Sequence, residues 1–145
     1  MNGPEPVVLI ADDCETDAVL MRSVFRGAGF TQPLQFAQDG EEAMAYLRGD
    51  GAYRNRTQFP LPSVLLLDLN RLRKNGLDVL SWLQDQTTIK RLPVYILSAS
   101  SRPEDIERAY ELGAHAYLLK PCSLDALTLM AKQLFAWLKI NQYTA

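Results

Sequence analysis

Short apolar runs separated by amphipathic stretches set the pattern of this chain. Four runs are too short for a helix and are rich in strand-forming residues. They predict buried strands at residues 7–11, 64–67, 94–97 and 117–119. A fifth run at residues 34–37 contains the polar Gln35, which favours a strand near the edge of the sheet.

Amphipathic helices are predicted between these strands. In residues 15–26, for example, Ala18, Met21 and Phe25 share one face. Similar spacing predicts helices at residues 39–47, at 76–83, at about 101–113 and from a Ser123 cap to Asn141. Residues 49–63 have no clear period and predict an exposed loop.

The fourth of these helices carries the clearest end signals. Ser101 and Glu104 match a capping box, with Pro103 in the first turn, and Gly113 suits a left-handed cap at the far end. Because strand and helix signals alternate along the whole chain, we expect parallel strands joined by right-handed crossovers, with helices on both faces. The fold class is therefore a doubly wound α/β domain.

Length and composition narrow the choice further. The 145 residues suit one domain at residues 7–140, between an extension at 1–6 and a tail at 141–145, with no output domain. A formal charge of −2 gives no general attraction to nucleic acid, and no apolar run is long enough to cross a membrane. The first six residues carry no basic side chain, unlike a secretion signal, so we expect a cytoplasmic protein.

Reactive polar residues follow the predicted strands. These residues are Asp12, Asp13, Asp68, Asn70, Ser98 and Lys120. In an open parallel sheet the carboxyl ends of the strands form the ligand-binding rim, so all six should converge there. Two cysteines, Cys14 and Cys122, are too few for a disulfide framework, and reduced thiols are expected.

The chemistry of this rim points to phosphoryl transfer. Clustered carboxylates repel one another, and Mg²⁺, which prefers oxygen ligands, would relieve that repulsion. Asp13, Asp68 and a backbone carbonyl near Asn70 would supply such a site, with Asp68 as the nucleophile that forms an aspartyl phosphate. Lys120 and the Ser98 hydroxyl would bind the phosphoryl oxygens.

Four motifs resemble the response-regulator receiver family of two-component signalling. They are Ala-Asp-Asp at 11–13, Leu-Asp-Leu-Asn at 67–70, Ser-Ala at 98–99 and Tyr-Leu-Leu-Lys-Pro at 117–121. The resemblance covers residues 7–138. It implies a flavodoxin-like, five-stranded parallel sheet in the order 2-1-3-4-5 with five helices.

The resemblance also assigns roles to these residues. It implies that Asp68 accepts phosphate from the phosphohistidine of a histidine kinase, while Asp13 binds Mg²⁺ with support from Asp12. The carbonyl of Asn70 would complete the protein ligands, and Lys120 would pair with the phosphoryl group.

A conformational switch follows from the same resemblance. Ser98 would move toward the phosphate and Tyr117 would follow it inward, which repacks the surface of the last two strands and helices. In this family the Lys120–Pro121 bond is usually cis. The alternative to this switch role is that Tyr117 is simply a half-buried aromatic residue of the strand.

The chain is similar to single-domain regulators that partner phytochrome-type kinases in three places. These are residues 39–47, the loop after them and residues 68–70. The kinase partner would then be of this type or a hybrid sensor. Output would come from binding a partner protein, a homodimer mate through the last two helices, or a downstream phosphotransfer protein.

One departure from the family motivates a second hypothesis. Leu72 stands where the family usually has proline, within a basic run at residues 71–74 that is either a solvated loop or a kinase-docking segment. The alternative is a pseudo-receiver that binds partners without phosphorylation. A third class, a Mg²⁺-dependent phosphohydrolase, needs an acid/base group where Asn70 stands, so we expect no small-molecule turnover.

Overall fold

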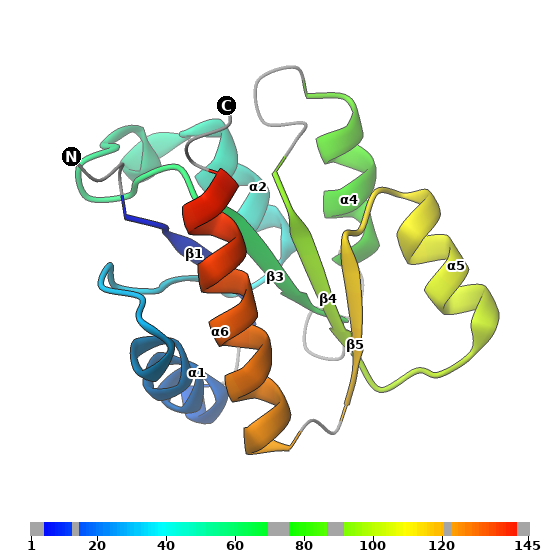
Figure 1. Ribbon diagram of the computed structural model, residues 1–145. Coiled ribbons are helices and arrows are strands. Elements are labelled where there is room, and N and C mark those ends of the chain that lie inside the picture. Colours follow the sequence, from blue (N-terminus) through cyan, green and yellow to red (C-terminus); the bar gives the residue numbers. More distant parts are fainter. Residues whose placement is uncertain (1–4, 13–14, 70–75, 87–91, 121–122, 142–145) are drawn as a thin grey trace.

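The protein is a five-stranded parallel sheet with helices on both faces (Figure 1). The computed structural model describes residues 5–12, 15–69, 76–86, 92–120 and 123–141. The strands are β1 (Val8–Ala11), β2 (Gln35–Ala37), β3 (Val64–Asp68), β4 (Val94–Ser98) and β5 (Ala116–Leu119). Their order in the sheet is β2-β1-β3-β4-β5, which confirms the predicted doubly wound architecture.

Two layers of helices enclose the sheet (Figure 1). Helices α1 (Glu15–Ala28) and α6 (Leu124–Asn141) pack together over one face. Helices α2 (Gly40–Arg48), α4 (Gly76–Gln84) and α5 (Pro103–Glu111) lie on the other side. The five helices correspond to those predicted from the periodicity, with ends that shift by at most two residues.

The central strands are buried on both faces. Successive side chains of a strand point to opposite sides of the sheet. In β1, Leu9 therefore packs in the core under α2 and α4, while Val8 and Ile10 pack in the core under α1 and α6. In β3, all five residues are buried, which explains why this strand has a continuous apolar run before its terminal Asp68.

Strand β5 is less buried than its sequence predicted. Its residues are half-buried or exposed, and Leu119 has 49% of its surface exposed. The reason is its place at the edge of the sheet, where it pairs only with β4. The prediction that residues 34–37 lie near an edge is confirmed, because β2 forms the opposite edge.

The start of α5 differs from the predicted capping box. The N-cap residue is Arg102, and its side chain makes no capping hydrogen bond to the helix backbone, so the assignment of Ser101 was wrong. Pro103 does occupy the first turn, and Gly113 has a φ of 106°, as a left-handed cap requires. The neighbouring Ser100 engages this helix instead, as described below.

The loop at residues 49–63 is not simply exposed, contrary to the prediction. It contains a short 3₁₀ helix, η1 (Gly51–Arg54), and it packs Tyr53 and Phe59 against the core. These rings meet the buried Tyr46 of α2 with centroid distances of 5.0 and 6.0 Å. The aromatic residues of this cluster follow neither a helical nor a strand period, so periodicity in the sequence did not predict it.

Arg56 joins this loop to the end of α2. Its Nη1 donates hydrogen bonds to the carbonyl oxygens of Tyr46 (2.8 Å) and Phe59 (3.2 Å), and its Nη2 donates to that of Leu47 (3.0 Å). The last carbonyls of a helix have no partner inside the helix. A cation at this position satisfies two of them and also lies at the negative end of the helix dipole.

The predicted cap of the last helix is confirmed. The backbone N–H of Ala126 donates to the Ser123 hydroxyl oxygen at 3.0 Å. Among the described helices, none is both long enough and apolar enough to cross a membrane.

Candidate functional site

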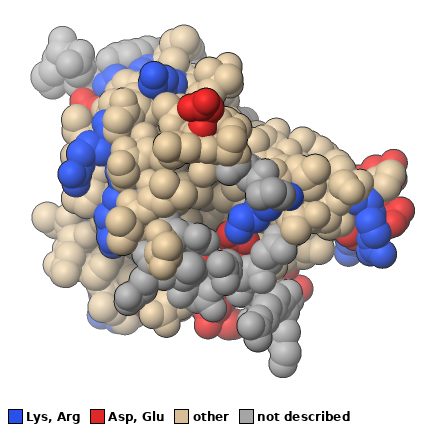
Figure 2. Space-filling model, turned by 90° about the horizontal axis from the view of Figure 1, so that it is seen from below, with Lys and Arg blue, Asp and Glu red and all other residues tan. Residues whose placement is uncertain are grey.

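The carboxyl ends of the strands bring several polar residues to one rim. Ala11 of β1 pairs with Leu67 of β3, so the residues that follow them, Asp12 and Asp68, lie at neighbouring strand ends. Both are buried, with 7% and 2% of their surfaces exposed. Figure 2 views this end of the molecule and shows acidic and basic side chains meeting near the middle of the face.

Asp68 forms an ion pair across the rim. The Nζ atom of Lys120, which directly follows β5, lies 2.5 Å from Asp68 Oδ2. The Lys120 side chain remains 27% exposed, whereas that of Asp68 is 3% exposed. A buried carboxylate needs such a partner because an uncompensated charge in the interior is costly. Lys120 is therefore held at a carboxylate oxygen of the predicted nucleophile.

Ser98 ends β4 beside this ion pair. It is buried, and its carbonyl oxygen accepts a hydrogen bond from the Lys120 N–H at 2.8 Å. That backbone bond fixes where Lys120 leaves the sheet. The Ser98 hydroxyl oxygen accepts a second bond, from the Ser100 N–H at 3.1 Å.

Asp12 is held by a continuation of the sheet. Its N–H donates to the Ala37 carbonyl oxygen at 2.9 Å, one residue beyond the β1–β2 ladder. Among the described candidates, Asp12, Asp68, Ser98 and Lys120 thus lie at the ends of four different strands, as predicted. The other candidates and flanking residues lie outside the described residues: Asp13, Cys14, Asn70, Leu72 with the basic run at 71–74, Pro121 and Cys122.

Tyr117 lies on β5 and reaches the loop between β4 and α5. Its hydroxyl donates a hydrogen bond to the Ser100 carbonyl oxygen at 2.9 Å. The ring is only partly buried and packs against the core on the α2, α4 and α5 side. Tyr117 is therefore anchored to the same loop that contacts the Ser98 hydroxyl.

Sequence reasoning missed a polar network at the start of α5. The Ser100 hydroxyl donates to Asp105 Oδ2, and Arg102 contacts both Asp105 oxygens through Nε and Nη2, each at 3.1 Å. These bonds from Arg102, and then from Ser100, lower the pKa of Asp105 below its ordinary value. The same pair raises the pKa of Arg102. Three serines between residues 98 and 101 gave no sign of which one would make these contacts.

Comparison with known proteins decides the family. Residues 8–132 match the response regulator receiver domain. The chain is a response regulator receiver domain. It is 34% identical to response regulator Rcp1 of Synechocystis over 90% of this chain and 87% of that protein.

Solved receiver structures agree with this assignment. Response regulator RPA3017, in red light signalling of R. palustris, has a TM-score of 0.82 at 33% identity and covers 91% of this chain and 92% of its own. The phosphorylated cyanobacterial phytochrome response regulator RcpA has a TM-score of 0.75 at 34% identity, covering 90% and 91%. This receiver domain therefore belongs to two-component signalling and has the flavodoxin-like receiver fold.

The donor atoms of the rim suit a hard divalent cation. Asp12 and Asp68 are buried carboxylates at adjacent strand ends, and carboxylate oxygens are the ligands that Mg²⁺ prefers. Within the described part of the chain, no group of three or more His, Cys, Asp or Glu side chains forms a metal cluster. Rcp1 has been solved in an Mn²⁺-bound form, with a TM-score of 0.77 and 34% identity over 94% of this chain and 96% of that one.

Proposed function

We propose that this receiver domain accepts a phosphoryl group on Asp68 from the phosphohistidine of a histidine kinase. The observation that carries the proposal is the ion pair between Asp68 and Lys120 at 2.5 Å. It places a cation at a nearly buried carboxylate, on the rim of strand ends where ligands bind in open α/β sheets. A structural salt bridge alone would not require a buried Asp12 beside it.

The transfer step follows from this arrangement. An Asp68 carboxylate oxygen attacks the phosphorus atom, and an O–P bond forms while the N–P bond to the kinase imidazole breaks. The electron pair of the broken bond stays on the imidazole nitrogen. Lys120 then pairs with the phosphoryl oxygens, and the Ser98 hydroxyl donates a hydrogen bond to them. Lys120 and the Ser98 hydroxyl both stabilise the negative charge on the phosphoryl oxygens during transfer.

Mg²⁺ is the proposed cofactor. We assign Asp13 and Asp68 as its carboxylate ligands and the backbone carbonyl of Asn70 as a third, with Asp12 in support. When bound, the cation neutralises charge on the transferring phosphoryl group. The oxygen-rich rim formed by Asp12 and Asp68 supports this assignment.

The proposed switch uses the loop between β4 and α5. When Ser98 turns toward the phosphoryl group, its hydroxyl oxygen gives up the bond from the Ser100 N–H. The Ser100 carbonyl, which holds Tyr117, belongs to the same residue. Displacement of Ser100 would therefore release Tyr117 to move inward and would change the surface at β5 and α5.

We further propose a phytochrome-type histidine kinase, or a hybrid sensor, as the donor in the cytoplasm. The relatives Rcp1, RcpA and RPA3017 support this choice. Output would be the binding of a partner, a second copy or a downstream phosphotransfer protein, with no small-molecule turnover. The exposed Leu129, Trp137 and Ile140 of α6 offer an apolar surface for such binding.

The decisive experiment is the intact mass of the protein after incubation with acetyl phosphate and Mg²⁺. One phosphoryl adduct is expected in the wild type, none in Asp68→Asn and none in a metal-free control. An adduct that persists in Asp68→Asn would reject Asp68 as the acceptor. A folded wild type that binds Mg²⁺ but forms no adduct would favour the pseudo-receiver, with Leu72 as the departure that explains it.

A further inference from the structure

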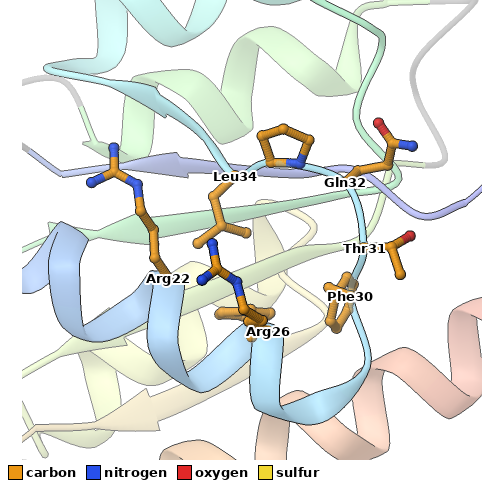
Figure 3. Close-up of a pocket in the computed structure, with 8 residues that line it drawn as sticks. Arg22, Arg26, Phe30, Thr31, Gln32 and Leu34 are labelled. Carbon is orange, nitrogen blue, oxygen red and sulfur yellow. The ribbon is translucent and has the colours of Figure 1, made fainter.

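A cavity of about 210 Å³ lies between α1 and the loop that leads into β2 (Figure 3). It is separate from the phosphorylation rim. Leu34 lines it and immediately precedes Gln35, which pairs with Leu9 of β1. Asp12 lies three residues beyond Leu9, about 10 Å along the strand at a rise of roughly 3.3 Å per residue. The cavity therefore opens toward the amino ends of the strands.

Two guanidinium groups line this cavity. Arg22 and Arg26 are one helical turn apart on α1, and both are exposed. No described carboxylate forms an ion pair with either of them. Like charges four residues apart on a helix repel each other. An anion bound between the two guanidinium groups would attract both of them and offset their mutual repulsion.

Arg22 is held in place by an aromatic ring. Its guanidinium carbon lies 4.8 Å from the ring centroid of Phe36 on β2, the edge strand. Such a cation–π contact restrains the Arg22 side chain. The guanidinium N–H groups can still donate hydrogen bonds to a ligand. The cost of ordering Arg22 on binding a ligand is reduced because the side chain already has one preferred position.

The walls of the cavity are rigid and apolar. Phe25 and Phe30 are buried and meet edge to face, with ring centroids 5.1 Å apart. The N–H of Phe30 donates to the Phe25 carbonyl oxygen at 3.1 Å across Gly29, whose φ of 113° permits this turn. In addition, Pro33 restricts the loop. The cavity is thus formed before any ligand arrives.

The loop at residues 31–34 closes one end of the cavity. Figure 3 shows Thr31 and Gln32 on the loop across from Arg22. Their polar atoms point outward, away from Arg22 and Arg26, and they are given no role in binding. The accessible lining therefore consists of two cations and the apolar Pro33 and Leu34.

The volume limits the size of the ligand. About 210 Å³ equals the share of roughly seven liquid water molecules at about 30 Å³ each. It is smaller than the roughly 300–1,000 Å³ of sites for drug-sized molecules. One carboxylate or phosphate group with a short apolar or aromatic substituent fits these dimensions.

We propose that this cavity binds a small organic anion, a carboxylate or phosphate monoester attached to an apolar group. Arg22 and Arg26 contact the anionic group, and the substituent packs on the accessible Pro33 and Leu34, which are backed by the buried Phe25 and Phe30. Because the site involves no residue of the phosphorylation rim, it stands whether or not Asp68 is phosphorylated.

The test is a titration of the ¹⁵N-labelled full chain, in Mg²⁺-free buffer, with phenyl phosphate, benzoate and inorganic phosphate. Saturable shifts are expected at the amides of residues 29–32 and of Leu34 for the two aromatic anions. Arg22→Gln and Arg26→Gln should each weaken binding at least tenfold. Arg108→Gln, which removes another exposed arginine on α5, should leave the affinity unchanged.

Three results would overturn the site. Shifts that do not saturate, or that weaken equally in Arg108→Gln, would indicate nonspecific ionic association. Shifts that vanish in Lys120→Ala but persist in Arg26→Gln would place the anion at the phosphorylation rim. Equal affinity for inorganic phosphate and phenyl phosphate would overturn the proposed organic anion, because the apolar substituent would contribute nothing to binding. Unfolding midpoints measured in parallel would show that each variant is folded.

Discussion

The hydroxyl of Tyr117 donates a hydrogen bond to the carbonyl oxygen of Ser100 at 2.9 Å. The N–H of the same Ser100 donates to the Ser98 hydroxyl oxygen at 3.1 Å. One residue thus connects the two predicted switch residues through its own backbone. In the proposed switch, a change at Ser98 would reach Tyr117 through this backbone connection.

Replacing Tyr117 with phenylalanine tests the first of these bonds. Loss of one partly exposed hydrogen bond should lower the free energy of unfolding by about 0.5–1.5 kcal/mol. The Ser100 and Ser101 amides should shift in NMR spectra, because the carbonyl loses its donor. Tyr95→Phe is a suitable control, since Tyr95 is a half-buried tyrosine of the adjacent strand. Equal effects of the two substitutions would show that the hydroxyl bond is unimportant.

Replacing Lys120 with alanine separates phosphorylation from the response to it. The folded state should persist, and Asp68 should still acquire phosphate, but the amides around Ser98 and Tyr117 should not move after phosphorylation. The reason is that the phosphoryl group loses the cationic partner that directly follows β5. Comparison of NMR spectra before and after acetyl phosphate treatment checks this, with the exposed Lys132→Ala as control. A wild-type response in Lys120→Ala contradicts the role.

Replacing Arg56 with alanine should destabilise the protein. The substitution removes three hydrogen bonds to carbonyl oxygens, two of them at the end of α2. We expect a loss of about 2 kcal/mol in the free energy of unfolding, the range for hydrogen bonds from charged groups. Urea denaturation measures it. The neighbouring exposed Arg54→Ala should cost far less, and a similar loss in both variants would argue against a specific role.

The Ser100–Arg102–Asp105 network should respond to acid. Hydrogen bonds from Arg102 and Ser100 hold the pKa of Asp105 below its ordinary value of 3.8. Because the folded pKa is lowered, the contribution is complete above pH 3.8 and is lost as the pH falls through the folded value. An NMR titration should show the Ser100 amide shifting only below that pH. The shift should be absent in Asp105→Asn.

The aromatic cluster of the loop should respond to alkali. Burial raises the pKa of Tyr46 to about 12, and burial together with a hydrogen bond to Glu42 raises the pKa of Tyr53 to about 12. Their ordinary value is 10.0, so the stabilisation is complete below pH 10 and is lost as the pH rises toward 12. Ultraviolet difference spectra of tyrosinate, folded against urea-unfolded, should show tyrosines that titrate late, with Tyr46 and Tyr53 among them. Tyr53→Phe should remove one of them.

Much of the rim could be predicted because the sequence indicates where each buried strand ends. A buried parallel strand has a continuous apolar run, and the first polar residue after it must lie at the rim. This reasoning located Asp12, Asp68, Ser98 and Lys120. Their chemical roles stay predictions, as do those of Asp13 and Asn70.

Other features depend on contacts that periodicity does not encode. The exposure of β5 could not be predicted, since an apolar run of its length looks the same in a central strand and an edge strand. The network at α5 depends on which serine of Ser98, Ser100 and Ser101 faces Asp105, and spacing allowed all three. The packed loop depends on Arg56 reaching back to α2, a contact between residues that share no repeat.

The loop at residues 49–63 packs together with the end of α2. The aromatic rings of Tyr53 and Phe59 and the hydrogen-bonded Arg56 side chain join the two segments into one assembly. Such an assembly loses its contacts together or not at all. Amide hydrogens of α2 and of η1 should therefore exchange with solvent at one common rate, distinct from those of α5. The loop thus makes this corner of the domain a single cooperative unit, separate from the proposed switch at α5.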